Sequence, residues 1–178
     1  MQGGTTDISD SAVQLEAATE ADAPMLANLL ELYVHDLSAA FPNVELGADG
    51  RFGYPQLPLY WSEPDRRFAF IVKHAGRIAG FVFAKVGSPA ADAADVLDVA
   101  EFFILRRYRR SGVGREAARR LWTLHPGRWT VRVYEANRSG LSFWTRVVEE
   151  FTAGQAQVFT RVDGPRAWRV FAFHAPRS

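Results

Sequence analysis

The feature that most constrains this chain is a strand-like segment that runs through a glycine-containing turn directly into an amphipathic helix. Residues 96–105 are strongly apolar and of strand length, and residues 112–124 carry their apolar side chains on one helical face. Between them lies Arg109-Arg110-Ser111-Gly112-Val113-Gly114. Two glycines spaced by one residue allow a tight turn and a close approach of a ligand to the backbone.

The start of this predicted helix is suited to an anion. The first N–H groups of a helix have no partner within the helix, and the helix dipole adds a partial positive charge there. Seven arginines lie between Arg106 and Arg120. We therefore predict that this corner binds a phosphate or a pyrophosphate.

Three phosphate-binding motifs compete for the segment. A nucleotide P-loop requires Gly-x-x-x-x-Gly-Lys-Ser/Thr, and no lysine stands in the required place. A dinucleotide fingerprint would have Ala117 as its third glycine, which is tolerated, but that fingerprint normally follows the first strand of a parallel sheet. The segment here follows predicted hairpins instead. The pattern Arg/Gln-x-x-Gly-x-Gly/Ala is matched in full by Arg109, Gly112 and Gly114.

With this last pattern the chain resembles the GNAT superfamily of N-acetyltransferases, in which the pattern binds the pyrophosphate of CoA. The preceding Phe102-Phe103-Ile104 resembles the family's fourth strand, whose backbone pairs with the pantetheine arm. The resemblance covers about residues 13–175, and the matches to the family's sequence motifs lie within residues 95–148. It implies acetyl-CoA as the co-substrate and no metal. The residues that it places at the cofactor are Phe103, Ile104, Leu105, Arg109, Arg110, Ser111, Gly112, Val113, Gly114 and Arg115.

A second match lies on the next predicted helix, where the family carries Asn-x-x-Ala-x-x-Phe-Tyr. Asn137, Phe143 and Trp144 follow this motif, with Gly140 in the alanine position. The resemblance places Asn137 and Trp144 at the cofactor. The family often uses the tyrosine to protonate the leaving thiolate, which an indole N–H cannot do. The substitutes that remain open are departure of the thiolate unaided, water, Tyr108 and Tyr134.

Two acidic residues inside residues 96–105 are candidates for a general base. Deprotonating an alkyl ammonium at pH 7 costs about 4–5 kcal/mol, so an amine acceptor needs such a base. Asp98 is similar in position to the acid that some family members use, whereas Glu101 lies among apolar neighbours, where an ionisable group is costly unless paired or functional. Regular pleating puts the two on opposite faces, and a β-bulge, frequent in this strand of the family, would reverse that. Pairing with an arginine is the structural alternative for either residue.

We expect the binding site for the acceptor amine in residues 41–64. This stretch is irregular and rich in proline and glycine, but it still carries five aromatic residues. Loops of this length are usually functional or disordered, and the aromatic residues indicate a packed lid. We predict that Tyr54, Tyr60 and Trp61 line an acceptor pocket, with core packing as the alternative. His35 is added because the helix that carries it borders the acceptor site in the family.

The order of the predicted elements indicates one mixed α/β domain around a single sheet. The resemblance implies the GNAT-type fold, with a mixed, mostly antiparallel sheet of six or seven strands that is splayed between the fourth and fifth strands and flanked by helices on both faces. Residues 13–178 form this domain after a disordered tail, residues 1–12. The predicted strands are residues 13–18, 67–74, 77–86, 96–105, 129–134, 151–160 and 167–173. The first predicted helix follows a capping box of Thr19 and Asp22 and is about 15 residues long. The other two predicted helices are residues 112–124 and 139–148.

Composition excludes several other classes of protein. The chain has no cysteine, which rules out disulfides, a thiol nucleophile and thiolate zinc sites, and its four histidines show no metal-ligand spacing. The net charge of +1 gives no reason to expect a nucleic-acid partner or a membrane surface. The apolar runs fall short of the ~20 residues of a membrane span. No secretory signal is apparent, so a cytoplasmic location is expected.

The sequence thus predicts an N-acetyltransferase that moves an acetyl group from acetyl-CoA to an amine by direct attack in a ternary complex. An acyl-CoA-binding or sensor domain without turnover is the main alternative, favoured by Trp144. A nucleotide-binding enzyme is the other. The sequence does not name the acceptor amine. A homodimer stays open, because dimers are common in the family.

Overall fold

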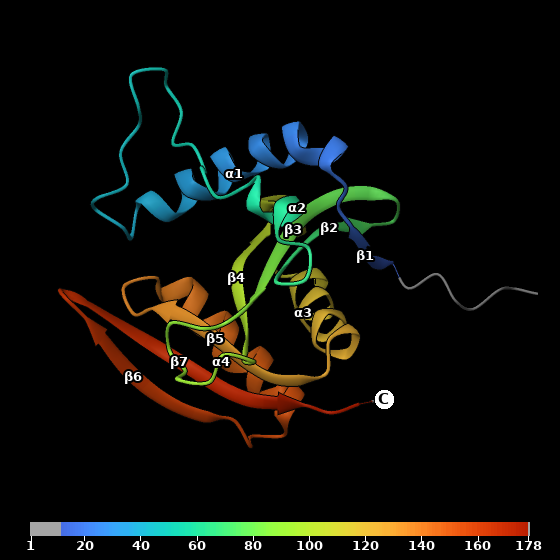
Figure 1. Cartoon of the computed structure of the whole chain (residues 1–178), viewed down its shortest axis with the longest axis vertical. Coiled ribbons are helices and arrows are strands. Elements are labelled where there is room, and N and C mark those ends of the chain that lie inside the picture. The colour runs from blue at the N-terminus through green and yellow to red at the C-terminus, as the bar shows by residue number, and fades with distance from the viewer. Residues whose placement is uncertain (1–11, 178) are drawn as a thin grey trace, which may run out of the picture.

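The computed structural model describes residues 12–177, which build one seven-stranded sheet of order β1-β2-β3-β4-β5-β7-β6 (Figure 1). The strands and the three long helices follow the predicted order along the chain, whereas the short helix at residues 59–62 lies in the stretch that was predicted to be irregular. Residues 1–11 of the predicted tail lie outside the described residues. The strands are β1 (Val13–Ala17), β2 (Arg67–His74), β3 (Arg77–Val86), β4 (Leu97–Ile104), β5 (Gly127–Tyr134), β6 (Gln157–Asp163) and β7 (Arg166–Ala175). The helices are α1 (Ala23–Ser38), α2 (Leu59–Ser62), α3 (Val113–Leu124) and α4 (Arg138–Thr152), with 3-10 turns η1 (Glu20–Asp22) and η2 (Arg106–Tyr108).

The sheet is antiparallel except between β4 and β5, which run parallel and then part. Their pairing is limited to three residue pairs, from Leu97–Trp129 to Val99–Val131. Beyond Val99 the two strands diverge, as Figure 1 shows, so the edge of β4 that faces β5 has no strand partner over residues 100–104. This confirms the predicted splay. An unpaired strand edge can hydrogen-bond an extended ligand.

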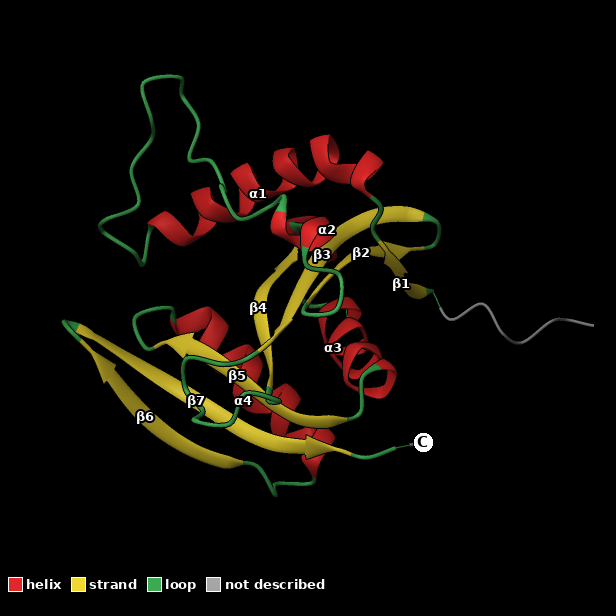
Figure 2. Cartoon of the chain, viewed as in Figure 1, coloured by secondary structure: helices red, strands yellow, loops and turns green. Residues whose placement is uncertain are grey.

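Helices cover both faces of the sheet (Figure 2). On one face α1 and α2 pack on apolar side chains that include Ile71, Phe81 and Phe83. On the other face α3 and α4 pack on residues that include Val72 and Val82. Alternate residues of a strand point to opposite faces, so the continuous apolar runs of β2 and β3 serve both layers.

A β-bulge in β4 decides which way its acidic residues face. Phe83 pairs with Glu101 and Ala84 pairs with Val99, which leaves Ala100 as an extra residue. Val99 belongs to the core beneath α3, whereas Ala100 packs into the core beneath α1 and Glu101 bonds a side chain of α1. The bulge therefore brings Asp98 and Glu101 to the same face, which regular pleating would not do.

The predicted strand over residues 151–160 is wrong at its start, and the predicted helix before it is too short. Helix α4 continues to Thr152, because Phe151 extends its apolar face against Trp122 and Phe173. The helix ends where Ala153 and Gly154 adopt φ angles of 50° and 76°. Strand β6 therefore begins only at Gln157.

Within residues 12–177, no helix combines the length and the apolar character that crossing a membrane requires.

Candidate active site

The turn that leads into α3 has the backbone conformation that an anion-binding corner requires. Arg110 and Gly112 adopt left-handed φ angles of 63° and 87°, and α3 begins at Val113. The backbone N–H groups of residues 110–115 find no hydrogen-bond acceptor among the described residues. These N–H groups and the helix dipole together favour a phosphate-type anion.

Arg109, the first residue of the motif, fixes the shape of this corner through its side chain. Its Nε donates to the carbonyl of Ile104 at 2.7 Å, and its guanidinium pairs with Asp36 of α1 at 2.5 Å. Arg106 donates to the same carboxylate at 2.6 Å. Burial works against ionisation of Asp36, but the hydrogen bonds from Arg109 and Arg106 prevail and hold its pKa below the ordinary value. The motif arginine therefore ties the turn to α1 and to the end of β4.

Gly114 allows α3 to lie close to α4. A Cβ at this position would lie 3.2 Å from ring carbons of Phe143 and 3.4 Å from Ile104. The contact with Phe143 is tighter than ordinary van der Waals contact, so a side chain at residue 114 would require that ring to shift by a few tenths of an ångström. The second glycine of the motif thus has a packing role here.

The residues predicted on α4 have structural roles that the geometry makes plain. Asn137 is the N-cap of α4, and its Oδ1 accepts from the N–H of Gly140 at 3.0 Å. A Cβ on Gly140 would lie 2.6 Å from Nδ2 of Asn137, so a side chain there would require the amide of Asn137 to shift. Trp144 is only 8% exposed and packs edge-on against Phe102 with ring centroids 4.8 Å apart. Contact of Asn137 and Trp144 with a cofactor stays a prediction.

Glu101 lies beneath α1 and receives two tyrosine hydroxyls. Tyr33 of α1 donates to one carboxylate oxygen at 2.6 Å, and Tyr54 donates to the other at 3.0 Å. Burial raises the pKa of Glu101 above its ordinary value, while the two hydrogen bonds and the charges of Arg132 and Lys85 oppose the rise. Burial and the neighbouring carboxylate also raise the pKa of both tyrosines, so they remain donors at neutral pH.

Asp98, the other candidate, is fully buried and engaged in a network. Arg132 of β5 donates to both of its oxygens, at 2.9 and 2.7 Å. Thr130 donates to it at 2.7 Å and Ser88 at 3.1 Å. The network joins β4 to β5 at the last point before they part. Asp98 therefore has the arginine partner that was expected if its role is structural rather than that of a general base.

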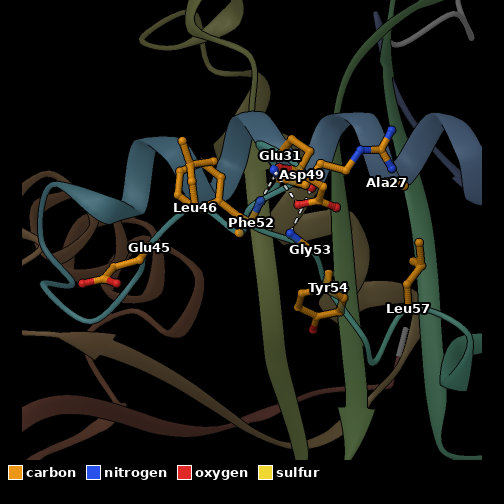
Figure 3. Close-up of a pocket in the computed structure, with 11 residues that line it drawn as sticks. Ala27, Glu31, Glu45, Leu46, Asp49, Phe52, Gly53, Tyr54 and Leu57 are labelled. Atoms are coloured by element: carbon orange, nitrogen blue, oxygen red, sulfur yellow. Dashed lines mark hydrogen bonds between the residues drawn. The ribbon is translucent and has the colours of Figure 1, made fainter.

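A pocket of about 540 Å³ opens between α1 and the loop that follows it (Figure 3). Glu31 of α1 holds this loop, because its carboxylate accepts from the backbone N–H groups of Phe52 and Gly53 at 2.8 and 3.0 Å. Tyr54 lines the pocket while its hydroxyl contacts Glu101. The pocket and the buried carboxylate therefore share one side chain.

The other residues predicted for the acceptor side do not line this pocket. Tyr60 is buried and stacks on Phe83 at 4.3 Å. The indole of Trp61 donates to the carbonyl of Ala18 at 3.3 Å. His35 is exposed, with its ring 6.4 Å from that of Phe52.

Two residues of this site are not among those predicted from the sequence. Tyr33 shares the apolar face of α1, and a hydroxyl on such a face signals a buried polar partner. Arg132 carries no local signal, because its partner Asp98 becomes a neighbour only through the pairing of β4 and β5. Of the tyrosines named as substitute acids, Tyr134 stacks on Phe41 at 4.7 Å and Tyr108 lies against His74 at 5.7 Å.

Among the described residues, no group of three or more His, Asp or Glu side chains could hold a metal ion.

These features define a class of protein that binds an extended, anion-bearing ligand along an opened sheet. The unpaired edge of β4 and the free N–H groups at α3 lie in consecutive segments, so one ligand can use both. The family model described as Acetyltransferase (GNAT) family matches residues 27–147, which is more than half of the chain. The chain belongs to the GNAT family of acetyltransferases.

Solved structures share the fold. An acetyltransferase from Thermus thermophilus is 22% identical with a TM-score of 0.64, and the match covers 92% of this chain and 97% of that one. Spermidine N-acetyltransferase from Vibrio cholerae, in complex with CoA and spermine, is 13% identical with a TM-score of 0.63 and coverage of 93% and 97%. A putative acetyltransferase from Salmonella typhimurium with acetyl-CoA is 12% identical with a TM-score of 0.61 and coverage of 94% and 96%. No curated protein matches the sequence.

Proposed function

We propose that this chain is an N-acetyltransferase that moves the acetyl group of acetyl-CoA to an amine by direct attack. The observation that carries the proposal is Glu101, a carboxylate held by two tyrosines two residues beyond the point where β4 and β5 part. Membership of the GNAT family supports acetyl transfer. Similar structures hold acetyl-CoA, or CoA together with spermine, which supports this donor and an amine acceptor.

The corner and the open edge of β4 together support a location for the cofactor. The N–H groups of residues 110–115 would bind the pyrophosphate, and the open edge of β4 up to Ile104 would pair with the pantetheine arm. Leu105 would not share in this pairing, because its N–H donates to Ala79 and its C=O accepts from Tyr108. This directs the thioester along β4 towards its bulge, where Glu101 lies. The acceptor would enter from the α1 side, through the pocket that Tyr54 lines.

In the proposed reaction the amine nitrogen attacks the thioester carbonyl carbon, and its proton passes to Glu101 directly or through one water. The C–S bond then breaks, and CoA leaves as a thiolate that takes a proton from solvent. Tyr33 and Tyr54 donate to the carboxylate and so favour its ionised form, which is the form that accepts a proton. Trp144 takes no part in proton transfer, because its ring is buried in the core beneath α3 and α4.

The proposal is tested by release of CoA from acetyl-CoA with a panel of amines. The panel comprises a polyamine, a free amino acid, an aminoglycoside and peptides that offer either a free N-terminus or a lysine. Turnover with any member, together with the mass of an acetylated amine, would support the proposal. Binding of acetyl-CoA without turnover on the whole panel would favour the sensor alternative. Stabilisation by ATP or NAD but not by acetyl-CoA would contradict the cofactor assignment.

Placing a negative charge at the corner should weaken cofactor binding. Ser111 is exposed in the turn, and its hydroxyl donates only to the carbonyl of Tyr108. In Ser111→Asp the new carboxylate would face the pyrophosphate, at a cost of at least about 1 kcal/mol at contact distance. We expect a Kd for acetyl-CoA that is roughly tenfold higher, measured by calorimetry.

A thermal shift and a matched variant control this experiment. Acetyl-CoA at ~100 times its Kd should raise the Tm of the unmodified protein by roughly 5–10 °C, and that of Ser111→Asp by less at the same concentration. Ser142→Asp carries the same change on an exposed position of α4 and should bind like the unmodified protein. Equal affinities for the two variants would place the pyrophosphate elsewhere.

A further inference from the structure

Lys85 places a cation on the face of the sheet against which α1 and α2 pack. It lies near the end of β3, two residues after Phe83, which belongs to the core beneath α1. Because alternate residues of a strand share a face, Lys85 lies on that face as well. The residue is half-buried, and within residues 12–177 its ammonium forms no ion pair and no hydrogen bond. Taking a charge out of water without a partner is costly, so we expect an anion at this position.

The charged residues beside Lys85 on this face are already paired. Arg67 on β2 and Asp98 on β4 are its direct cross-strand neighbours. Arg67 bonds Glu63 at 2.7 Å, and Arg132 donates to both oxygens of Asp98. Two cations, Arg67 and Lys85, thus lie directly opposite each other, an arrangement that destabilises a sheet. Lys85 is therefore available to bind an anion that a ligand brings.

Glu101 is the diagonal neighbour of Lys85 across β3 and β4. Phe83 pairs with Glu101, and Lys85 pairs with Asp98 on the other side of the bulge. Diagonal neighbours on one face are about 7–8 Å apart, within the reach of a long side chain. Burial raises the pKa of Glu101, and the charge of Lys85 is one of those that oppose the rise. The carboxylate of the proposed base and the ammonium of Lys85 thus lie side by side.

We propose that the acceptor carries a carboxylate a few bonds from its amine, as an amino acid does, and that Lys85 binds this carboxylate. The assignment rests on the proposed function, in which Glu101 takes the proton of the amine on the same molecule. An amino acid offers an amine and a carboxylate at short spacing, which matches the adjacent Glu101 and Lys85. A polyamine would instead bring a second cation close to Lys85 and Arg67, at a Coulombic cost.

The pocket that Tyr54 lines is compatible with such an acceptor. Two of its three carboxylates are engaged by the loop, because Glu31 accepts from the backbone N–H groups of Phe52 and Gly53 and Asp49 accepts from that of Arg51. The guanidinium of Arg51 adds a cation to the same lining. The pocket therefore admits a zwitterion as well as a cation, and Lys85 selects the zwitterion.

Matched acceptors test the proposal through release of CoA from acetyl-CoA. Each of the common amino acids is compared with its own carboxamide, which keeps the amine and the side chain but has no carboxylate, and with 1,4-diaminobutane. For the amino acids that are acetylated, kcat/KM should be at least about tenfold higher than for the carboxamides and the diamine. Equal or faster turnover of the carboxamides or the diamine would overturn the role of Lys85 and leave the proposed function standing. Binding of acetyl-CoA without turnover of any of these amines would contradict the proposed function itself, and this inference with it.

Variants of Lys85 separate binding of the acceptor from an electrostatic effect on Glu101. Lys85→Met removes the charge and should raise KM for the acetylated amino acid by roughly 10–100-fold, while KM for its carboxamide hardly changes. Lys85→Arg keeps the charge and should restore most of the affinity. If Lys85 only stabilised the ionised form of Glu101, Lys85→Met would slow both acceptors equally and shift the pH profile, and that result would overturn the proposal. Lys73→Met is the matched control, because this other lysine of the chain pairs with Glu16 on β1, and it should behave like the unmodified protein.

Discussion

Glu101→Gln is expected to lower kcat by roughly 10²–10⁴-fold while acetyl-CoA binds as before. The amide keeps the size of the side chain and can still bond Tyr33 and Tyr54, but it cannot take a proton from the amine. The cofactor corner involves other residues, so affinity for acetyl-CoA should not change. Steady-state kinetics with an acceptor identified from the amine panel measures the first effect, and calorimetry measures the second.

The pH profile separates a base from a structural carboxylate. Glu101 has to be ionised to accept a proton, so activity should rise with pH through its raised pKa and level off above it. Tyr33→Phe removes a hydrogen bond that favours the ionised form, so the rising limb should move to higher pH. A merely structural role for Tyr33 would lower activity without moving the limb.

A matched substitution controls the change of charge. Glu16 on β1 is an exposed acid that pairs with Lys73, and Glu16→Gln should retain full activity. A Glu101→Gln variant with the kcat of Glu16→Gln would eliminate Glu101 as the base. Asp98 or a water would then have to take that role.

Asp98→Asn is expected to reduce the free energy of unfolding by about 3–5 kcal/mol. The substitution leaves Arg132 as an uncompensated charge whose side chain is only 19% exposed. It also weakens the hydrogen bonds from Thr130 and Ser88 at the junction of β4 and β5. For a domain of this length the Tm should fall by roughly 6–20 °C, measured by thermal unfolding without ligand.

Asp95→Asn provides the comparison for this prediction. Asp95 pairs with Arg128, but both side chains are more than half exposed, so solvent screens the pair and the Tm should hardly change. Equal Tm values for the two variants would show that the buried network does not stabilise the fold. A stable Asp98→Asn protein that has lost turnover would instead return Asp98 to the list of candidate bases.

Local patterns in the sequence were sufficient for most of the fold. The hairpin of β2 and β3 follows from Ala75-Gly76, which adopt the left-handed φ angles of 48° and 72° that such a turn requires. The capping box of Thr19 and Asp22 forms at η1, immediately before α1. The corner before α3 was predictable because Gly112 and the start of a helix suffice to define it. These features depend on residues that are neighbours along the chain.

Local patterns placed the boundary between α4 and β6 wrongly. Phe151 is the first residue of the predicted strand 151–160, but it also continues the helical spacing of Val147 and Val148. Packing of Phe151 against Trp122 and Phe173 decides for the helix. Those partners are distant in sequence, so periodicity alone could not choose.

What the sequence by itself determined is the family, the order of the strands and the long helices, and the turn before α3, because short motifs and periodicity carry each of them. What only the tertiary structure decided is the arrangement around the two acids. The bulge at Ala100 follows from the register between β3 and β4, and it turns Glu101 towards α1. Tyr33 and Tyr54 meet Glu101 from positions 68 and 47 residues away in the sequence, and Arg132 meets Asp98 across the last paired residues of β4 and β5. Such contacts depend on how sheet and helices pack, which no local pattern of residues encodes.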